Sequence, residues 1–197
     1  MKWIFTLSDE EYKACKKFAD DSSNSQREYR SGGTMQRSVG QIFYDTFRGK
    51  VGEIVVKHFL EQEPLKVKGI HLDFGVYHRG VWDTSDIELN GKRIAVKSSK
   101  HFARWLLLET KDIKRGDSYD YYILVLINED FKEGKINGFA YKKEIIEPNK
   151  ETLFLQKGEF IPYTSMVLDA DNHARHSDNL HNSEKDWIEF ARDCNGR

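Results

Sequence analysis

The stretch that decides the fold is Trp82-Asp-Thr-Ser-Asp-Ile-Glu-Leu-Asn-Gly-Lys-Arg-Ile-Ala-Val-Lys-Ser-Ser99. Two runs of alternating apolar and polar residues flank Asn90-Gly91, and an Asn-Gly pair in this position is the strongest short-range signal of a β-hairpin with a two-residue turn. The cross-strand pairs counted outward from the turn are Leu89 with Lys92, Glu88 with Arg93, Ile87 with Ile94, Asp86 with Ala95 and Thr84 with Lys97. The sequence therefore predicts both a hairpin and its register.

The two faces of this hairpin differ in their chemistry. Because successive strand residues point to opposite faces, one face is apolar and is expected to belong to the core: Ile87, Leu89, Ile94 and Val96. The other face carries Asp86, Glu88, Arg93, Ala95 and Lys97. An ordinary solvated surface would also account for that face. Its charges are segregated, however, since the first strand holds the acids and no acid occurs from Asn90 to Trp105.

A carboxylate facing a lysine on the next strand suits metal-assisted hydrolysis of a phosphodiester. Carboxylate oxygens are the hard ligands that Mg²⁺ takes. The metal polarises the phosphate and stabilises the leaving oxygen, while a lysine steadies the attacking water and the developing negative charge. Asp86 is therefore a candidate metal ligand, and Lys97 is a candidate catalytic residue.

Asp86, followed after a turn by Ala95-Val-Lys97, resembles the Asp…(Glu/Asp)-x-Lys hairpin of the PD-(D/E)XK nuclease superfamily, which includes most type II restriction endonucleases. The run Phe47-Arg-Gly-Lys-Val-Gly-Glu53 resembles the helix that brings a glutamate to the metal cluster in many members. The run Tyr119–Ile127 resembles the core strand that follows. The resemblance covers residues 47 to 128 and implies a restriction endonuclease-like fold with Mg²⁺ as cofactor.

The chain departs from that pattern at Ala95, which stands where the second acid is expected and cannot bind a metal. Some restriction endonucleases with a small residue there recruit a glutamate from further along the chain. Glu109 is the corresponding candidate, and Glu53 is the other. The Val96 carbonyl is a plausible further ligand. Asp83 falls on the opposite face of an unbulged hairpin, so it is expected to cap the strand or to serve as an alternative ligand.

The remaining patterns predict one α+β (α/β/α-like) domain, a central mixed β-sheet flanked by helices. The capping-box sequence Ser8-Asp-Glu-Glu11 starts one helix, and helical spacing from Gln36 to Phe59 gives either one kinked helix or two short ones. The expected strands are Lys68–Tyr77, the hairpin, Tyr119–Ile127, Ile136–Tyr141 and Leu153–Leu155, and the expected last helix starts at Ser183. The segments of this domain, residues 1–197, are an N-terminal helical segment (1–35), a catalytic core (47–128) and C-terminal strands, loop and helix (129–197).

The distribution of charge along the sequence indicates where DNA could bind. The sequence has 31 Lys and Arg against 32 Asp and Glu, which argues against a protein that coats nucleic acid without selectivity. Asn90 to Trp105 nevertheless holds five bases and no acid. The candidate DNA-contacting residues are Ser98, Ser99, Lys100, His101 and Arg104 after the hairpin, and Arg30 and Arg37 before it.

Several classes of function lack support. No apolar run is long enough to span a bilayer, and the first residues are too short a run for a signal segment. These features predict a cytoplasmic protein. The two cysteines have no metal-ligand spacing. No phosphate-binding loop, dinucleotide fingerprint or serine-hydrolase signature occurs, so no nucleotide cofactor is expected. The polar, histidine-rich run 169–181 is expected to be a loop.

These inferences combine into one functional expectation. The chain is expected to be a Mg²⁺-dependent endodeoxyribonuclease acting on double-stranded DNA, most simply a sequence-specific type II restriction endonuclease. A homodimer is expected because a twofold dimer matches a palindromic site. Two alternatives remain open: a repair or junction-resolving nuclease of the same fold, and a non-catalytic DNA-binding module that has lost the acid at Ala95.

Overall fold

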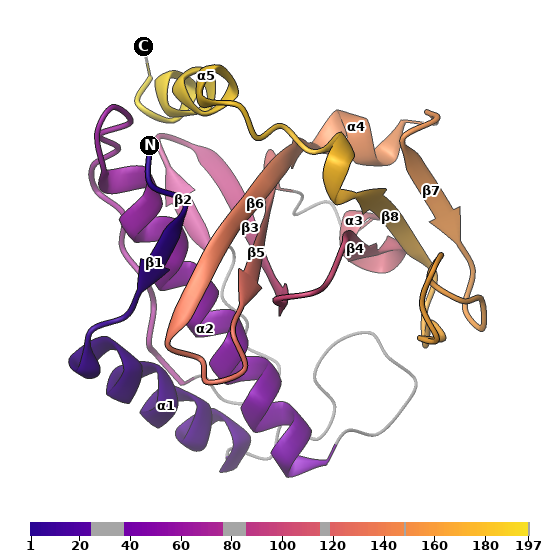
Figure 1. Cartoon of the computed structure of the whole chain (residues 1–197), viewed down its shortest axis with the longest axis horizontal. Helices are drawn as coiled ribbons and strands as arrows, with labels where there is room; N and C mark the ends of the chain where they lie inside the picture. Colours follow the sequence, from indigo (N-terminus) through magenta and orange to yellow (C-terminus); the bar gives the residue numbers. More distant parts are fainter. Residues whose placement is uncertain (25–37, 77–85, 115–118, 148, 197) are drawn as a thin grey trace.

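The computed structural model describes residues 1–24, 38–76, 86–114, 119–147 and 149–196 (Figure 1). The helices are α1 (Asp9–Asn24), α2 (Val39–Glu61), α3 (Thr110–Lys114), α4 (Lys142–Ile146) and α5 (Glu184–Cys194), with a single 3-10 turn, η1 (Ser177–Asn179). The strands are β1 (Ile4–Thr6), β2 (Ile87–Leu89), β3 (Lys92–Lys100), β4 (Trp105–Glu109), β5 (Tyr121–Ile127), β6 (Glu133–Tyr141), β7 (Thr152–Leu155) and β8 (Asn172–His176).

The strands form two sheets. The larger is mixed, with the order β1-β6-β5-β3-β2, and only β3 and β5 pair in parallel. The smaller sheet is antiparallel, with the order β4-β8-β7. The expected α+β architecture with a mixed sheet and helices is therefore confirmed. In place of the expected α/β/α-like layering, helices cover one face of the larger sheet and the smaller sheet covers the other.

Strands β2 and β3 are joined by a tight turn. Their paired residues are Ile87 with Ile94, Glu88 with Arg93 and Leu89 with Lys92, as counted from the sequence. Asn90 and Gly91 have φ angles of 48° and 77°, in the left-handed region that both central residues of a type I′ turn require.

The long helix α2 is continuous from Val39 to Glu61, so of the two expected arrangements the single helix is formed and the two short helices are not. Ser38 caps it, because its hydroxyl accepts a hydrogen bond from the Gln41 backbone N–H while the Gln41 side chain accepts one from the Ser38 N–H. Gly52 lies directly against β3: a Cβ there would be 1.8 Å from Ser98 Oγ. Glycine at this position therefore lets the helix approach the strand that carries Lys97.

The larger sheet is covered on both faces (Figure 1). Helices α2 and α5 pack on one face, where Val55, Phe59 and Trp187 meet the sheet residues Ile123 and Phe139. The smaller sheet covers the other face through a second cluster that includes Leu106 and Leu108 of β4 with Ala95, Tyr122 and Leu124. All seven residues of β5 are buried, which explains its unbroken apolar sequence.

Three local predictions differ from the structure. The expected strand Lys68–Tyr77 is irregular over its described residues, 68–76, and the chain there turns at Gly69, with φ 79°. Its apolar residue Ile70 is buried as part of a connecting segment, not as a strand. The N-terminal helical segment begins with a strand, β1, at the sheet edge. None of the helices among the described residues is long and apolar enough to cross a membrane.

The third difference is in the run 169–181, where β8 occupies the centre of the smaller sheet. The polar composition of this run predicted a loop, but Arg175 is accommodated inside a strand because a carboxylate of the same protein pairs with its charge. The Arg175 side chain is 3% exposed and its Nη2 atom is 2.5 Å from the Glu151 carboxylate. A buried arginine paired in this way fits in a sheet interior. The pattern of apolar and polar residues in this segment does not otherwise indicate a strand.

Candidate active site at the end of β3

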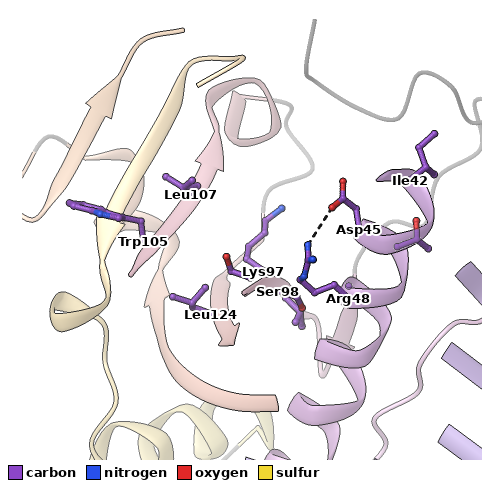
Figure 2. A pocket seen from close by; sticks show the side chains of 12 residues that line it. Ile42, Asp45, Arg48, Lys97, Ser98, Trp105, Leu107 and Leu124 are labelled. Atoms are coloured by element: carbon purple, nitrogen blue, oxygen red, sulfur yellow. Dashed lines mark hydrogen bonds and ion pairs between the residues drawn. The ribbon is translucent and has the colours of Figure 1, made fainter. Parts of the chain in front are cut away.

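A cavity of about 450 Å³ lies between α2, β3 and β4 (Figure 2). Its lining from α2 consists of Ile42, Asp45, Thr46, Arg48 and Gly49. The rest of the lining is Val96, Lys97, Ser98 and Ser99 from β3, Trp105 and Leu107 from β4, and Leu124 from β5. The larger sheet, the smaller sheet and the longest helix thus each supply one wall.

Lys97 is half-buried in this cavity. Its Cα pairs with that of Leu124 on the parallel strand β5, so the most buried strand of the sheet fixes its position. Figure 2 shows the Lys97 side chain directed toward α2, where Arg48 Nη1 lies 3.4 Å from Asp45 Oδ1. The charged groups lining the cavity are therefore two cations and one carboxylate.

Asp86 lies beside the edge of β3, just before β2 begins. Its Oδ2 atom accepts a hydrogen bond of 2.7 Å from the backbone N–H of Val96, the residue before Lys97. Ile87 faces the helix-covered core, so alternation places Asp86 on the opposite face, which is also the face of Lys97. The acid and the lysine singled out in the sequence are thus neighbours across the same strand edge.

The Glu53 side chain faces the layer formed with α1, not the cavity. Its Oε2 is 2.6 Å from the buried Lys50 Nζ, which also donates to the Asp73 carbonyl oxygen at 2.7 Å. The Lys50 Nζ lies over the ring of Phe18 on α1. Because neighbouring helix positions are about 100° apart, the contact of Gly52 with β3 directs Glu53 away from that strand.

The helix acid that lines the cavity is Asp45, which the sequence reasoning missed. Asp45, Gly49 and Gly52 are spaced i, i+4 and i+7, so they share one face of α2. Because glycine has no side chain and permits close approach, Gly49 and Gly52 mark the face of α2 that approaches another element. Counting back one and two helical turns from Gly52 was the signal that could have found both Gly49 and Asp45.

Glu109 is the last residue of β4 and lies among charged residues that do not line the cavity: Lys111, Asp112 and Asp169. Burial raises the pKa of Glu109, and the negative charges of Asp112 and Asp169 raise it further against the opposing effect of Lys111. The Lys111 Nζ lies 3.5 Å from Glu109 Oε2. That oxygen is buried and has no hydrogen-bond partner in the part of the chain that the structure describes.

The two glutamates predicted to join Asp86 at the metal lie beside lysines, Glu53 against Lys50 and Glu109 against Lys111. Within ranges 1–24, 38–76, 86–114, 119–147 and 149–196, no three or more His, Cys, Asp or Glu side chains are arranged to hold a metal ion. Asp83, Arg30 and Arg37 lie outside the described residues, so the roles suggested for them stay predictions.

Cations without acidic partners gather around the cavity. Lys97, Lys100 and Arg104 have no carboxylate at ion-pair distance among the described residues, although Lys50, Lys57 and Arg175 each have one. Ser98 and Ser99 line the cavity between them, and the buried Ser98 Oγ has no hydrogen-bond partner within the described ranges. His101 is exposed in the turn that follows β3. This concentration of uncompensated positive charge suits an anionic ligand.

Comparisons with known proteins give no identity: no family model, no curated protein and no solved structure matches the chain.

Proposed function

We propose that the protein is a Mg²⁺-dependent endodeoxyribonuclease of the restriction endonuclease-like type, whose active site is the β2–β3 hairpin with the adjoining cavity. The observation that carries the proposal is the hydrogen bond from Val96 N–H to Asp86. It sets an acid beside β3 one residue before Lys97, and Lys97 lines a cavity whose charged residues, Lys97, Arg48 and Asp45, carry a net positive charge. DNA phosphates are the polyanion that such a site would bind.

The oxygen donors near the hairpin are of the kind that magnesium prefers. Magnesium sites use one or two carboxylates, with water and substrate phosphate completing the shell. Asp86, the Val96 carbonyl and Asp45 would supply the protein oxygens. Asp45 would replace the second carboxylate, which the family pattern places at the position of Ala95. Glu53 is the less suitable helix acid because its carboxylate is buried against Lys50 and does not line the cavity. Asp45 pairs with Arg48 at 3.4 Å, but its side chain is 45% exposed and lines the cavity. When bound, the metal would polarise the scissile phosphate and lower the pKa of a water molecule.

The remaining steps belong to the side chains. Lys97 holds the attacking water and stabilises the negative charge that develops on the phosphate oxygens. Arg48 and the Ser99 hydroxyl group bind and orient the phosphate from the cavity walls. Asp86 holds the edge of β3 in place through Val96 as well as offering its carboxylate. A homodimer, with one such site for each DNA strand, is part of the proposal for a palindromic duplex target.

The test is cleavage of supercoiled plasmid by purified protein with Mg²⁺ and with EDTA. Wild type is expected to cut only with Mg²⁺, and Lys97→Ala to lose cleavage while still binding DNA. Lys185→Ala, a lysine on α5 with an 84% exposed side chain, is the matched control and should cut normally. Retained cleavage by Lys97→Ala would refute the assignment of Lys97. Binding without any Mg²⁺-dependent cleavage would instead support the non-catalytic DNA-binding module.

A further inference from the structure

The turn between β3 and β4 presents an aromatic ring among positive charges. Residues 100–104 read Lys-His-Phe-Ala-Arg, and all except Ala103 are exposed. Phe102 is 62% exposed. The Lys100 Nζ lies 5.8 Å from the centre of its ring, and the His101 ring packs edge-on at 5.2 Å. The apex of the turn is therefore a flat apolar surface with cationic neighbours.

This turn is held firmly at both ends. The Ala103 N–H donates to the Lys100 carbonyl oxygen at 2.9 Å, which closes the turn. The Ser177 N–H donates to the Arg104 carbonyl oxygen at 2.8 Å, which ties its end to the segment after β8. Loop residues fixed in this manner lose little conformational freedom when a ligand binds.

The turn also continues directly from the cavity. Ser99 precedes it and Trp105 follows it, and both line the cavity. A DNA strand whose phosphate lies at Lys97 would therefore pass next to Phe102. Isolated exposed apolar residues are common on proteins, but this one combines a ring, neighbouring cations with no acidic partner among the described residues, and a position in the turn between two residues that line the cavity. Stacking rings beside a cationic track are the usual means of holding single-stranded nucleic acid.

We propose that the β3–β4 turn binds an unpaired nucleotide of the DNA substrate, with Phe102 stacked on its base and Lys100 and Arg104 contacting the adjoining phosphates. This inference rests on the proposed function. It defines the substrate class more narrowly, since the base faces inside a paired duplex are covered by their neighbours. A nucleotide turned out of the duplex next to the cut site meets the requirement, as does an unpaired nucleotide in a flap or a branch.

The test measures binding in EDTA, so that it does not depend on cleavage. The probes are a fluorescein-labelled oligothymidylate and a labelled blunt duplex of the same length, followed by fluorescence anisotropy. Phe102→Leu is expected to weaken binding to the oligothymidylate by about 5- to 100-fold, the usual effect of losing one stacked base, with little change for the duplex. Phe102→Tyr keeps a ring and is expected to keep the affinity.

Phe160→Leu is the matched control because Phe160 has the same 62% exposure but follows the acidic Glu159, away from the cavity lining. It should bind both probes as wild type does. Unchanged oligothymidylate binding by Phe102→Leu, or an equal loss on both probes, would overturn the stacking role while leaving the nuclease proposal intact. Wild-type protein that binds neither probe would overturn both proposals. Thermal unfolding of each variant establishes that the fold is retained.

Discussion

The carboxylate of Asp86 accepts the backbone N–H of Val96 at 2.7 Å, directly before the lysine on which the proposed chemistry depends. This one contact gives Asp86 a role in the fold as well as a proposed role in metal binding. The two roles are separable by substitution, because the hydrogen bond needs only an acceptor whereas the metal needs a negative oxygen.

Asp86→Asn is accordingly expected to fold and fail to cut. The amide oxygen can still accept from Val96, so the free energy of unfolding should stay within about 1 kcal/mol of wild type. Asp86→Ala should lose about 1–3 kcal/mol, because it leaves the buried Val96 N–H without its acceptor. Thermal melts and plasmid cleavage measure the two effects, and cleavage by Asp86→Asn at the wild-type rate would show that Asp86 acts only on the fold.

The second prediction concerns which acid of α2 serves the site. Asp45→Asn is expected to lower Mg²⁺-dependent cleavage by at least about 100-fold, as losing a directly acting charge commonly does. DNA binding in EDTA should strengthen, because a negative charge is removed from the cavity. Normal cleavage by this variant would return the role to Glu53.

The role of Glu53 in cleavage can be tested without leaving the buried Lys50 ammonium unpaired. Glu53→Gln alone strands the Lys50 ammonium, and breaking a buried pair in this way costs about 3–5 kcal/mol. The double variant Lys50→Met/Glu53→Gln removes both charges and should be far less destabilised. We expect this double variant to cut DNA, and its failure to cut while folded would contradict the assignment to Asp45.

The third prediction uses the raised pKa of Glu109. In the folded protein this group holds its proton to a higher pH than in the unfolded chain, so its ionisation opposes folding above the native pKa. The penalty disappears as the pH falls below the unfolded value. Glu109→Gln should therefore raise the melting temperature at pH 7, with a gain that shrinks on acidification, and it should leave cleavage unchanged. Lost cleavage in a folded Glu109→Gln protein would make Glu109 the second acid after all.

The fourth prediction concerns salt. If Arg104 contacts a phosphate, Arg104→Ala should reduce the slope of log binding constant against log salt concentration by about 1. Anisotropy titrations across a series of NaCl concentrations measure the slope, with Lys185→Ala again as the control. An unchanged slope would remove Arg104 from the proposed phosphate contacts.

Elements with strong local signals could be predicted from the sequence. Ser8 and Glu11 form the expected reciprocal cap, and Ser183 and Asp186 do the same for α5. The pairing of β2 with β3 was predictable because the Asn90-Gly91 turn needs positive φ angles, which few residue types adopt. Such features are local because the physical cause lies within a few residues of its effect.

The parts that could not be predicted depend on distant partners. The burial of Arg175 requires Glu151, and the direction of Glu53 requires Lys50 and the neighbouring α1. The smaller sheet joins β4 to strands far along the chain, so no local pattern announced it. Asp45 lines the cavity because α2 lies against β3, a contact between elements that are distant in sequence.

The connection from β3 to β4 also affects how the cavity forms during folding. Ser99 and Trp105 are separated by a short turn, so closing that part of the cavity costs little chain entropy. The opposite wall comes from α2, which is distant in sequence from β3 and must find it by long-range contact. The cavity is thus completed only when α2 has docked on β3, and variants that slow this docking should delay the recovery of activity after β3 and β4 have formed.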